Sequence, residues 1–377
     1  MLSPKKNKKE QIEMNNMIIN EPIFKTFCRE RNLSPGSVKV YSHALGKYIE
    51  YNQLTLTELI TEAETEEDQR IRWKRRTLKH RLINFRNHLI DYGYAKETIT
   101  TMMKRVITFY RHYEIEIHHL PRVNIQSTVE IKIPTRENLQ TALESSKPLM
   151  KALILFLVSS GMSKVDCLKL TIQDFIIATE DYHNSTDILE VMSILKDRND
   201  VTPTFALTRT KTNKFHYTFC SPEATTSIVN YLYSRKDTLK PESPLFKISP
   251  LWLSIKFEDL NESLNLGVTH GNNYGILRCH TLRKYHATTL RNDGLSIDII
   301  NSLQGKAKNR VDQAYYIDTP EQLKKLYLDH VNCLYISDEL KFKSENEVLQ
   351  EENKTLKERE NKLLDIMERL ERLEQMD

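Results

Sequence analysis

Glycine is scarce in this sequence, with 9 among 377 residues. A turn-rich all-β fold needs more glycines, and Leu, Glu, Lys and Ile are abundant, so the composition favours helix. Cysteines are also few, and their odd number and the lack of any C-x-x-C pair argue against a disulfide framework and a zinc site. We expect five reduced thiols: Cys28, Cys167, Cys220, Cys279 and Cys333.

Long hydrophobic runs are missing too. The longest, Ala152–Val158 (ALILFLV), is far too short to cross a bilayer, and the first residues, MLSPKKNKKE, have no apolar core like that of a signal peptide. We therefore expect a cytoplasmic protein that does not enter membranes. The sequence also has no compact Asp/Glu cluster of the spacing that a metal-dependent nuclease needs, so no metal site is expected.

Positive charge is present but unevenly spread, although the net charge is only +4. Residues 70–111 hold twelve Lys/Arg against two acids, and residues 338–377 hold eight against thirteen. A dense basic stripe is the usual electrostatic footprint for a nucleic-acid backbone, whereas a solvated helix surface explains a single cluster equally well. We predict DNA contacts from one segment, RIRWKRRTLKHR: Arg72, Lys74, Arg75, Arg76, Lys79 and Arg81.

Helical periodicity predicts a first, helical domain over residues 18–120. Ser34 is a suitable N-cap and Pro35 suits the first helical position, where a missing N–H does no harm. Apolar stripes then recur at helical spacing in residues 78–89 and 96–113. Residues 1–17 are predicted to be a flexible basic tail, and the polar stretch between Pro121 and Pro134 predicts a linker over residues 121–136.

A second domain is predicted over residues 137–337, with a buried helix at 149–159 and strands at 204–210 and 215–220. In the second strand Phe215, Tyr217 and Phe219 alternate with polar or small residues, which is the pattern of a half-buried strand. Asn213 lies in the predicted hairpin tip, because Asn tolerates the left-handed conformation. The expected fold is mainly α with a small β-sheet.

The C-terminal segment, residues 338–377, repeats a hydrophobic residue every seven positions, which predicts a long, coiled-coil-like helix. The positions that would complete the seam are mostly Asn and Glu, so both self-association and a fully solvated helix stay open. The repeated hydrophobic residues are Phe342, Leu349, Leu356, Leu363 and Leu370.

The stretch CHTLRKYH places His280 and Arg283 three residues apart near the start of a predicted helix. Residues at this spacing share one helix face, so the imidazole and the guanidinium could both reach one bound anion. A helix-end capping pair with solvent-facing charge is the alternative. Spacing alone therefore predicts no more than an anion site.

The order of four motifs resembles the catalytic domain of the tyrosine recombinases, the phage and archaeal integrase family. The motifs are RTKTNKFHYTF with Lys211, HTLRKYHATTL with His280 and Arg283, LQGKA with Lys306, and DQAYYID with Tyr315. The segment SSGMSKVDCLKLTIQDF is similar to the helix that carries the family's first arginine, and SPGSVKVY is similar to the start of its core-binding domain. The resemblance lies in order and spacing rather than in one motif.

The resemblance covers roughly residues 20–336 and implies a core-binding domain, a catalytic domain and site-specific recombination or integration of a mobile element. It implies that Tyr315, or Tyr316 as the fallback, attacks a phosphodiester of double-stranded DNA and forms a 3′-phosphotyrosyl bond and a free 5′-hydroxyl. The covalent link conserves the energy, so no cofactor is expected. Strand exchange implies a homo-oligomer, a tetramer, on DNA, and no small-molecule substrate.

The resemblance also implies a role for each cation. Arg283 would bind the phosphate, because a guanidinium fork suits two nonbridging oxygens. His280 would bind a phosphate oxygen and help to manage the proton of the nucleophile, and Lys211 would protonate the departing 5′-oxygen. Lys306 stands where the family usually has His or Trp and is still a donor.

One departure from the family pattern is important, because the first arginine aligns with Ser163 and the nearest cation is Lys164. Either Lys164 replaces it, another residue such as Arg209 moves in, or the enzyme is slowed. Asp166 is interpreted as a structural partner of a helix or of Lys164. Two further hypotheses remain: a degenerate recombinase that binds its sites without cleaving them, and a zipper-type transcription regulator that dimerises through its acidic C-terminal heptads.

Overall fold

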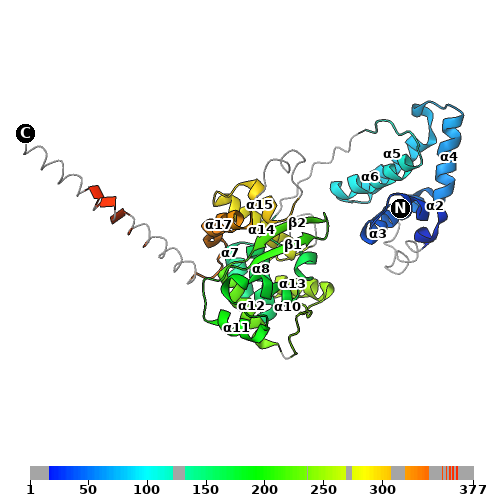
Figure 1. Ribbon diagram of the computed structural model, residues 1–377. Coiled ribbons are helices and arrows are strands. Elements are labelled where there is room, and N and C mark those ends of the chain that lie inside the picture. Colours follow the sequence, from blue (N-terminus) through cyan, green and yellow to red (C-terminus); the bar gives the residue numbers. More distant parts are fainter. Residues whose placement is uncertain are drawn as a thin grey trace, which may run out of the picture. The chain divides into compact units, whose positions relative to one another are not determined.

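The computed structural model describes residues 17–121, 132–235, 237–268, 274–306 and 319–338, with single residues between 350 and 363. Contacts divide the chain between Val129 and Glu130 into two compact units, here called unit 1 and unit 2, whose helices and strands are labelled in Figure 1. No helix in the described ranges is both long enough and apolar enough to cross a membrane.

The described residues of unit 1 form helices and connecting loops and contain no strand. At the start of its longest helix, Ser34 accepts a hydrogen bond from the backbone N–H of Ser37 at 3.3 Å and Pro35 is the first helical residue, so the predicted cap is confirmed. The elements are α2 (Pro22–Glu30), α3 (Pro35–Asn52), α4 (Leu56–Asp68), the short 3₁₀-helix η1 (Trp73–Arg75), α5 (Thr77–Asp91) and α6 (Lys96–His112).

The core of unit 1 forms where α3, α5 and α6 pack against one another. Leu78, Leu82, Phe85 and Leu89 are buried on one side of α5, as the apolar stripe predicts. At the centre, the ring of Tyr48 lies 5.1 Å from that of Phe85 in an edge-on arrangement. The apolar faces of α5 and α6 are thus used inside the unit, which leaves their polar faces for solvent or a partner.

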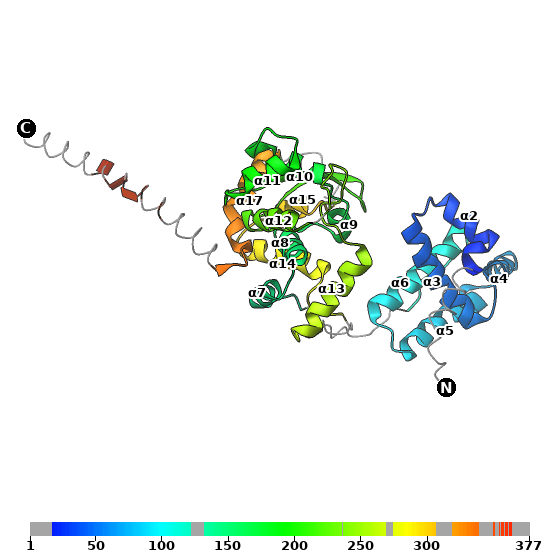
Figure 2. The ribbon, with the colours of Figure 1, turned by 90° about the horizontal axis from the view of Figure 1, so that it is seen from below.

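Unit 2 is built around α8 (Pro148–Ser160), whose residues from Ala152 to Ser160 are all buried. Helices α12 and α14 pack against it (Figures 1 and 2). The other elements are α7 (Arg136–Glu144), α9 (Lys164–Cys167), α10 (Ile172–Ala178), η2 (Glu180–Tyr182), α11 (Ile188–Lys196), β1 (Thr204–Arg209), β2 (Lys214–Phe219), α12 (Pro222–Ser234), α13 (Pro250–Ser263), α14 (Cys279–Asn292), α15 (Ile297–Leu303), α17 (Pro320–His330) and η3 (Val331–Leu334).

These elements confirm the predicted fold class, mainly α with a small β-sheet. The two strands form an antiparallel hairpin in which Thr204 pairs with Phe219 and Arg209 with Lys214. The hairpin turn is therefore residues 210–213, one residue earlier than predicted, and Asn213 has the positive φ of 49° that its type favours. Arg136 already belongs to α7, so the predicted linker runs one residue too far.

The second strand is half-buried as predicted, but its polar side chains face inward together with Phe219. His216 and Thr218 are buried, whereas Phe215 is 54% exposed. The inward position of Thr218 is satisfied because its hydroxyl donates to the carbonyl of Ser160 at 2.8 Å. This orientation carries His216 towards the end of α8 and the turn that follows α15.

A second apolar cluster ties the hairpin to the C-terminal helices of unit 2. Phe219 of β2 packs with Leu290 of α14, Ile300 of α15 and Leu323 of α17. The hydroxyl of Tyr327 on α17 also donates to the carbonyl of Ser159 at 3.0 Å. The hairpin, the end of α8, α14 and α15 are thereby held in one rigid framework, which positions the polar residues described next.

Candidate active site

Arg283, in the second turn of α14, is held by two backbone carbonyls from distant parts of unit 2. Its Nη1 donates to the carbonyl of Gly161 at 2.6 Å, and its Nη2 donates to the carbonyl of Gln304 at 2.7 Å. Burial, with the nearby charge of Arg209, lowers the pKa of Arg283 to about 10. The guanidinium is therefore fixed and charged at neutral pH.

Arg209, the last residue of β1, lies beside Arg283. Its Nη1 donates to the carbonyl of Gly305 at 2.9 Å, so the two guanidinium groups are anchored on consecutive carbonyls, those of Gln304 and Gly305. The Nε of Arg209 is buried without a hydrogen-bond partner among the described residues. The hairpin thus contributes a second, incompletely satisfied guanidinium to the same place.

Lys306 adds a third positive charge to this group. It follows Gly305 directly, and its backbone N–H donates to the carbonyl of Asn301 at 2.9 Å. Burial and the charges of Arg283 and Arg209 lower the pKa of Lys306. Arg209, Arg283 and Lys306, here called the cation cluster, therefore repel one another, and a bound anion would relieve that repulsion.

His280 lies at the N-terminal end of α14, close enough to the cation cluster to feel its charge. Partial burial of the ring, followed by the charges of Lys284 and Arg278, lowers the pKa of His280 below its usual value of 6.5; Arg283 and Lys306 act in the same direction. The imidazole is consequently neutral at pH 7 and able to accept a proton.

Ser163 and Asp166 occupy the place where the family's first arginine is expected. The hydroxyl of Ser163 donates to Oδ2 of Asp166 at 2.6 Å, and the backbone N–H of Thr210 donates to Oδ1 at 2.9 Å. These hydrogen bonds more than offset burial, so the pKa of Asp166 is lowered. Asp166 is thus a structural partner that ties α9 to the hairpin turn, and its partners do not include Lys164.

The structure does not bring Lys164 into the cation cluster. Its Nζ donates to the carbonyl of Pro250 at 2.6 Å and to Oγ of Ser254 at 2.7 Å, both at the start of α13. A lysine committed to these acceptors is a poor replacement for a phosphate-binding arginine. The predicted catalytic role of Lys164 therefore gains no support from this placement.

The catalytic roles of Lys211 and Tyr315 stay predictions. Lys211 is exposed in the hairpin turn, and no polar group of the described residues contacts its side chain. Tyr315 and Tyr316 lie outside the described residues. The predicted set that the structure does bring together is therefore His280, Arg283 and Lys306.

Three buried residues that the motifs did not single out support this set. Gln304 is 1% exposed, and its Nε2 lies 3.0 Å from the carbonyl oxygen of Arg283 and 3.1 Å from Nδ1 of His286. Complete burial lowers the pKa of His286 to about 3, so this imidazole stays neutral. His286 packs against Gly161, and His216 packs against Gly305 in the same manner. All three lie within the quoted motifs, Gln304 in LQGKA, His286 in CHTLRKYH and His216 in RTKTNKFHYTF, but the spacing of these motifs gives them no role.

The basic segment of unit 1 splits into two groups. The side chains of Arg72, Lys74 and Arg75, around η1, are exposed, and that of Lys79 on α5 is partly exposed. No acidic partner of these four side chains occurs within the described residues. They remain candidates for a polyanion contact.

Arg76 and Arg81, by contrast, are used inside unit 1. Arg76 is buried, donates from Nε to the carbonyl of Ile71 at 3.0 Å and forms an ion pair with Glu67. Arg81 forms two parallel hydrogen bonds with Glu62, at 2.7 and 2.8 Å. Both guanidinium groups bind carboxylates of α4, so these contacts do not support the predicted DNA contacts of Arg76 and Arg81.

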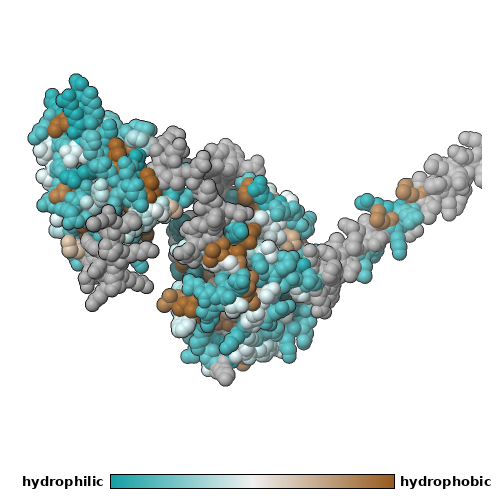
Figure 3. Space-filling model, turned by 180° about the vertical axis from the view of Figure 1, so that it is seen from behind, coloured by the Kyte–Doolittle hydropathy of each residue, from teal (hydrophilic) through white to brown (hydrophobic). Residues whose placement is uncertain are grey.

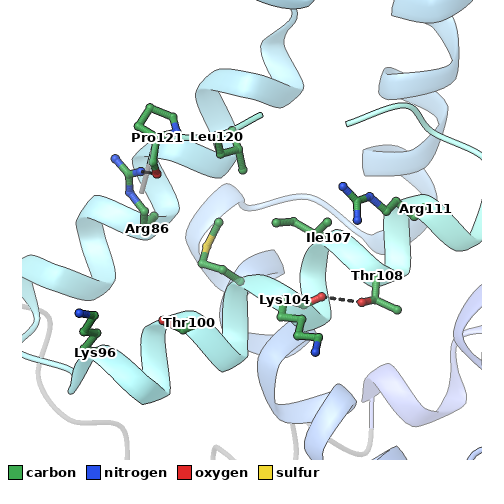
Figure 4. Close-up of a pocket in the computed structure, with 10 residues that line it drawn as sticks. Arg86, Lys96, Thr100, Lys104, Ile107, Thr108, Arg111, Leu120 and Pro121 are labelled. Atoms are coloured by element: carbon green, nitrogen blue, oxygen red, sulfur yellow. Dashed lines mark hydrogen bonds between the residues drawn. The ribbon is translucent and has the colours of Figure 1, made fainter. Parts of the chain in front are cut away.

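A groove of about 600 Å³ along α6, bordered by Arg86 of α5 and by Leu120 and Pro121, forms a second basic surface (Figure 4). Arg86, Lys96, Lys104 and Arg111 surround an apolar floor that includes Met103. Arg86 Nη1 also donates to the carbonyl of Pro121 at 2.6 Å. None of the described residues that line the groove is acidic, and the face of the molecule in Figure 3 is largely hydrophilic with scattered apolar residues. The groove therefore offers a partner an apolar strip that is bordered by four positive charges.

Comparison with known proteins bears on these observations. Residues 223–333 match a family model described as archaeal phage integrase, and this segment includes His280, Arg283 and Lys306. No curated protein sequence matches the chain significantly. No group of three His, Cys, Asp or Glu side chains within the described ranges could hold a metal ion.

Two solved structures share the fold. One is the XerH site-specific recombinase bound to its palindromic difH substrate in a post-cleavage complex, with 15% identity, coverage of 86% of this chain and 90% of that chain, and a TM-score of 0.51. The other is the Tn1549 transposon integrase in complex with transposon right end DNA, with 12% identity, coverage of 80% and 96%, and a TM-score of 0.51. The resemblance is thereby confirmed: the chain has the tyrosine recombinase fold, and its residues 223–333 match the archaeal phage integrase family.

Proposed function

We propose that the protein is a site-specific recombinase that cleaves and rejoins double-stranded DNA through a 3′-phosphotyrosyl intermediate. The observation that carries this proposal is Arg283, held rigidly by two carbonyls beside two other cations and a neutral His280. Such a group is suited to a phosphate, since phosphoryl transfer depends mainly on positioning and on stabilising charge on the nonbridging oxygens. The XerH and Tn1549 structures described above are both complexes with DNA.

In the proposed reaction the phenol oxygen of Tyr315 attacks phosphorus and forms the O–P bond, while the bond from phosphorus to the 5′-oxygen breaks. His280, neutral before the reaction, takes the proton of the phenol. The electron pair of the broken bond stays on the 5′-oxygen, which takes a proton from Lys211. Rejoining reverses these steps with a 5′-hydroxyl from a partner strand. Exchange between two duplexes requires several subunits, and we propose a tetramer on DNA.

Capture of covalent adducts tests this function and identifies the target site in the same experiment. The full chain is incubated with duplexes that carry nicks and a randomised central segment, then denatured, and DNA that stays attached to protein is isolated and sequenced. We expect attached DNA with a shared sequence. DNA that binds but is never attached would instead favour the non-cleaving binding protein, which the serine at position 163 also fits.

Replacement of Arg72, Lys74 and Arg75 by alanine tests the basic surface around η1. We expect weaker binding to any duplex and a slope of log affinity against log salt that is shallower by about 2–3, because each phosphate contact contributes about 0.9. Filter binding at several salt concentrations measures the slope. The charge-matched control changes three exposed cations of α2 and α3: Lys25, Arg29 and Lys39. Equal slopes in both variants would rule out this surface.

The pH dependence of adduct formation tests the role of His280. Because only the neutral imidazole accepts a proton and its pKa is lowered, we expect the rate at low DNA concentration to fall with decreasing pH only below 6.5. His280→Gln should lose this acid limb and be slower by about 10²–10⁴. An acid limb that is unchanged in the variant would show that another group takes the proton.

A further inference from the structure

The hydrogen bonds of Arg209 leave most of its guanidinium available. A guanidinium has five N–H donors, and within the described residues that of Arg209 makes one hydrogen bond, from Nη1 to Gly305. Its Nε is buried and has no partner in this part of the chain. Buried donors are nearly always satisfied, so an unpaired one next to open donors points to a missing acceptor. Arg209 is anchored on the carbonyl of Gly305, next to the carbonyl of Gln304 that holds Arg283. The missing acceptor must therefore lie beside Arg283.

The charge around Arg209 indicates what kind of acceptor fits. Asp166 is the one described carboxylate whose charge acts on Arg283, and both its oxygens already accept hydrogen bonds, from Ser163 and from the backbone of Thr210. It forms no ion pair with Arg209 or Arg283. No described carboxylate forms an ion pair with the three cations of the cation cluster. Together they form a site for an anion with several oxygens. A phosphodiester offers two nonbridging oxygens, enough for one per arginine.

We propose that Arg209 binds a nonbridging oxygen of the scissile phosphate and so replaces the arginine that the chain lacks at Ser163. The inference rests on the proposed function and adds a residue to it. β1 places the guanidinium beside Arg283, whereas Ser163, the N-cap of α9, has no positive charge and Lys164 is bound to Pro250 and Ser254. Arg209 stays charged throughout, and no proton moves to or from it.

Rates of adduct formation with the duplex that the wild type captures test the assignment. Arg209→Ala should cleave about 10²–10³ times more slowly, the usual loss for one transition-state donor. Arg209→Lys keeps the charge without the planar fork and should recover part of the rate. Lys164→Ala should cleave near the wild-type rate. Arg198→Ala is the matched control, because this half-buried arginine interacts with Asp200 and the ring of Tyr182 and not with the cation cluster, and thermal unfolding checks that each variant folds.

Titration with inorganic phosphate, followed by calorimetry, separates this inference from the proposed function. We expect Arg209→Ala to bind phosphate more weakly than the wild type, and Lys164→Ala and Arg198→Ala to bind it equally well. If the wild type cleaves and Lys164→Ala is slow while Arg209→Ala is not, the assignment fails and the function stands. If no duplex is cleaved but phosphate binding depends on Arg209, the anion site stands and the function fails. If phosphate binding is unchanged and nothing is cleaved, both fail.

Discussion

Replacement of Tyr315 by phenylalanine is expected to abolish the covalent protein–DNA adduct while DNA affinity stays near that of the wild type. The change removes only the phenol oxygen, which is the proposed nucleophile, and keeps the ring. Without that oxygen no O–P bond can form, and the phosphate-binding residues cannot supply one. Denaturing electrophoresis measures the adduct, and filter binding measures the affinity of the same preparation.

Tyr316→Phe is the matched control, because the neighbouring tyrosine differs in position alone. We expect it to form adducts, and digestion of the wild-type adduct should yield a nucleotide attached to the peptide that contains Tyr315. Loss of the adduct in Tyr316→Phe alone would move the nucleophile to that residue. Adducts in a variant that lacks both hydroxyls would contradict a tyrosine mechanism at this segment.

Local signals explain why much of the fold could be predicted. Ser34 and Pro35 start α3 through a cap that needs only neighbouring residues, and the stripe from Leu78 to Leu89 fixes the buried side of α5. The motif H-x-x-R likewise needs only helical spacing to place His280 and Arg283 at the start of α14.

Long-range contacts explain what the sequence could not show. Arg76 and Arg81 look like their exposed basic neighbours until α4 brings Glu67 and Glu62 against them. The anchor of Arg209 is equally hidden, because it depends on the register of a hairpin and on a carbonyl 96 positions away. Such pairings are set by tertiary packing, which a single sequence does not encode in any local pattern.

One of the two carbonyls that hold Arg283 belongs to Gly161. Replacement of this glycine gives the largest predicted loss of stability. Gly161 ends α8 with a φ of 59°, and a Cβ added there would lie 2.7 Å from Cγ of the fully buried His286. Gly161→Ala therefore combines left-handed strain of about 1–2 kcal/mol with overpacking of about 1–3 kcal/mol. We expect the free energy of unfolding of unit 2 to fall by about 2–5 kcal/mol in denaturant titrations.

Gly294→Ala is the control that separates these two causes, because Gly294 also has a positive φ, 101°, but its added Cβ would meet no atom closer than 3.9 Å. The free energy of unfolding of Gly294→Ala should therefore fall by the left-handed strain alone, without the overpacking. His286→Ala removes the ring with which the new Cβ of Gly161→Ala would collide. The double variant should therefore lose less free energy of unfolding than the sum of the losses of the two single variants. Equal losses in Gly161→Ala and Gly294→Ala, or strict additivity with His286→Ala, would show that the ring can move aside. The carbonyl of residue 161 would then be less rigid than the two hydrogen bonds of Arg283 require.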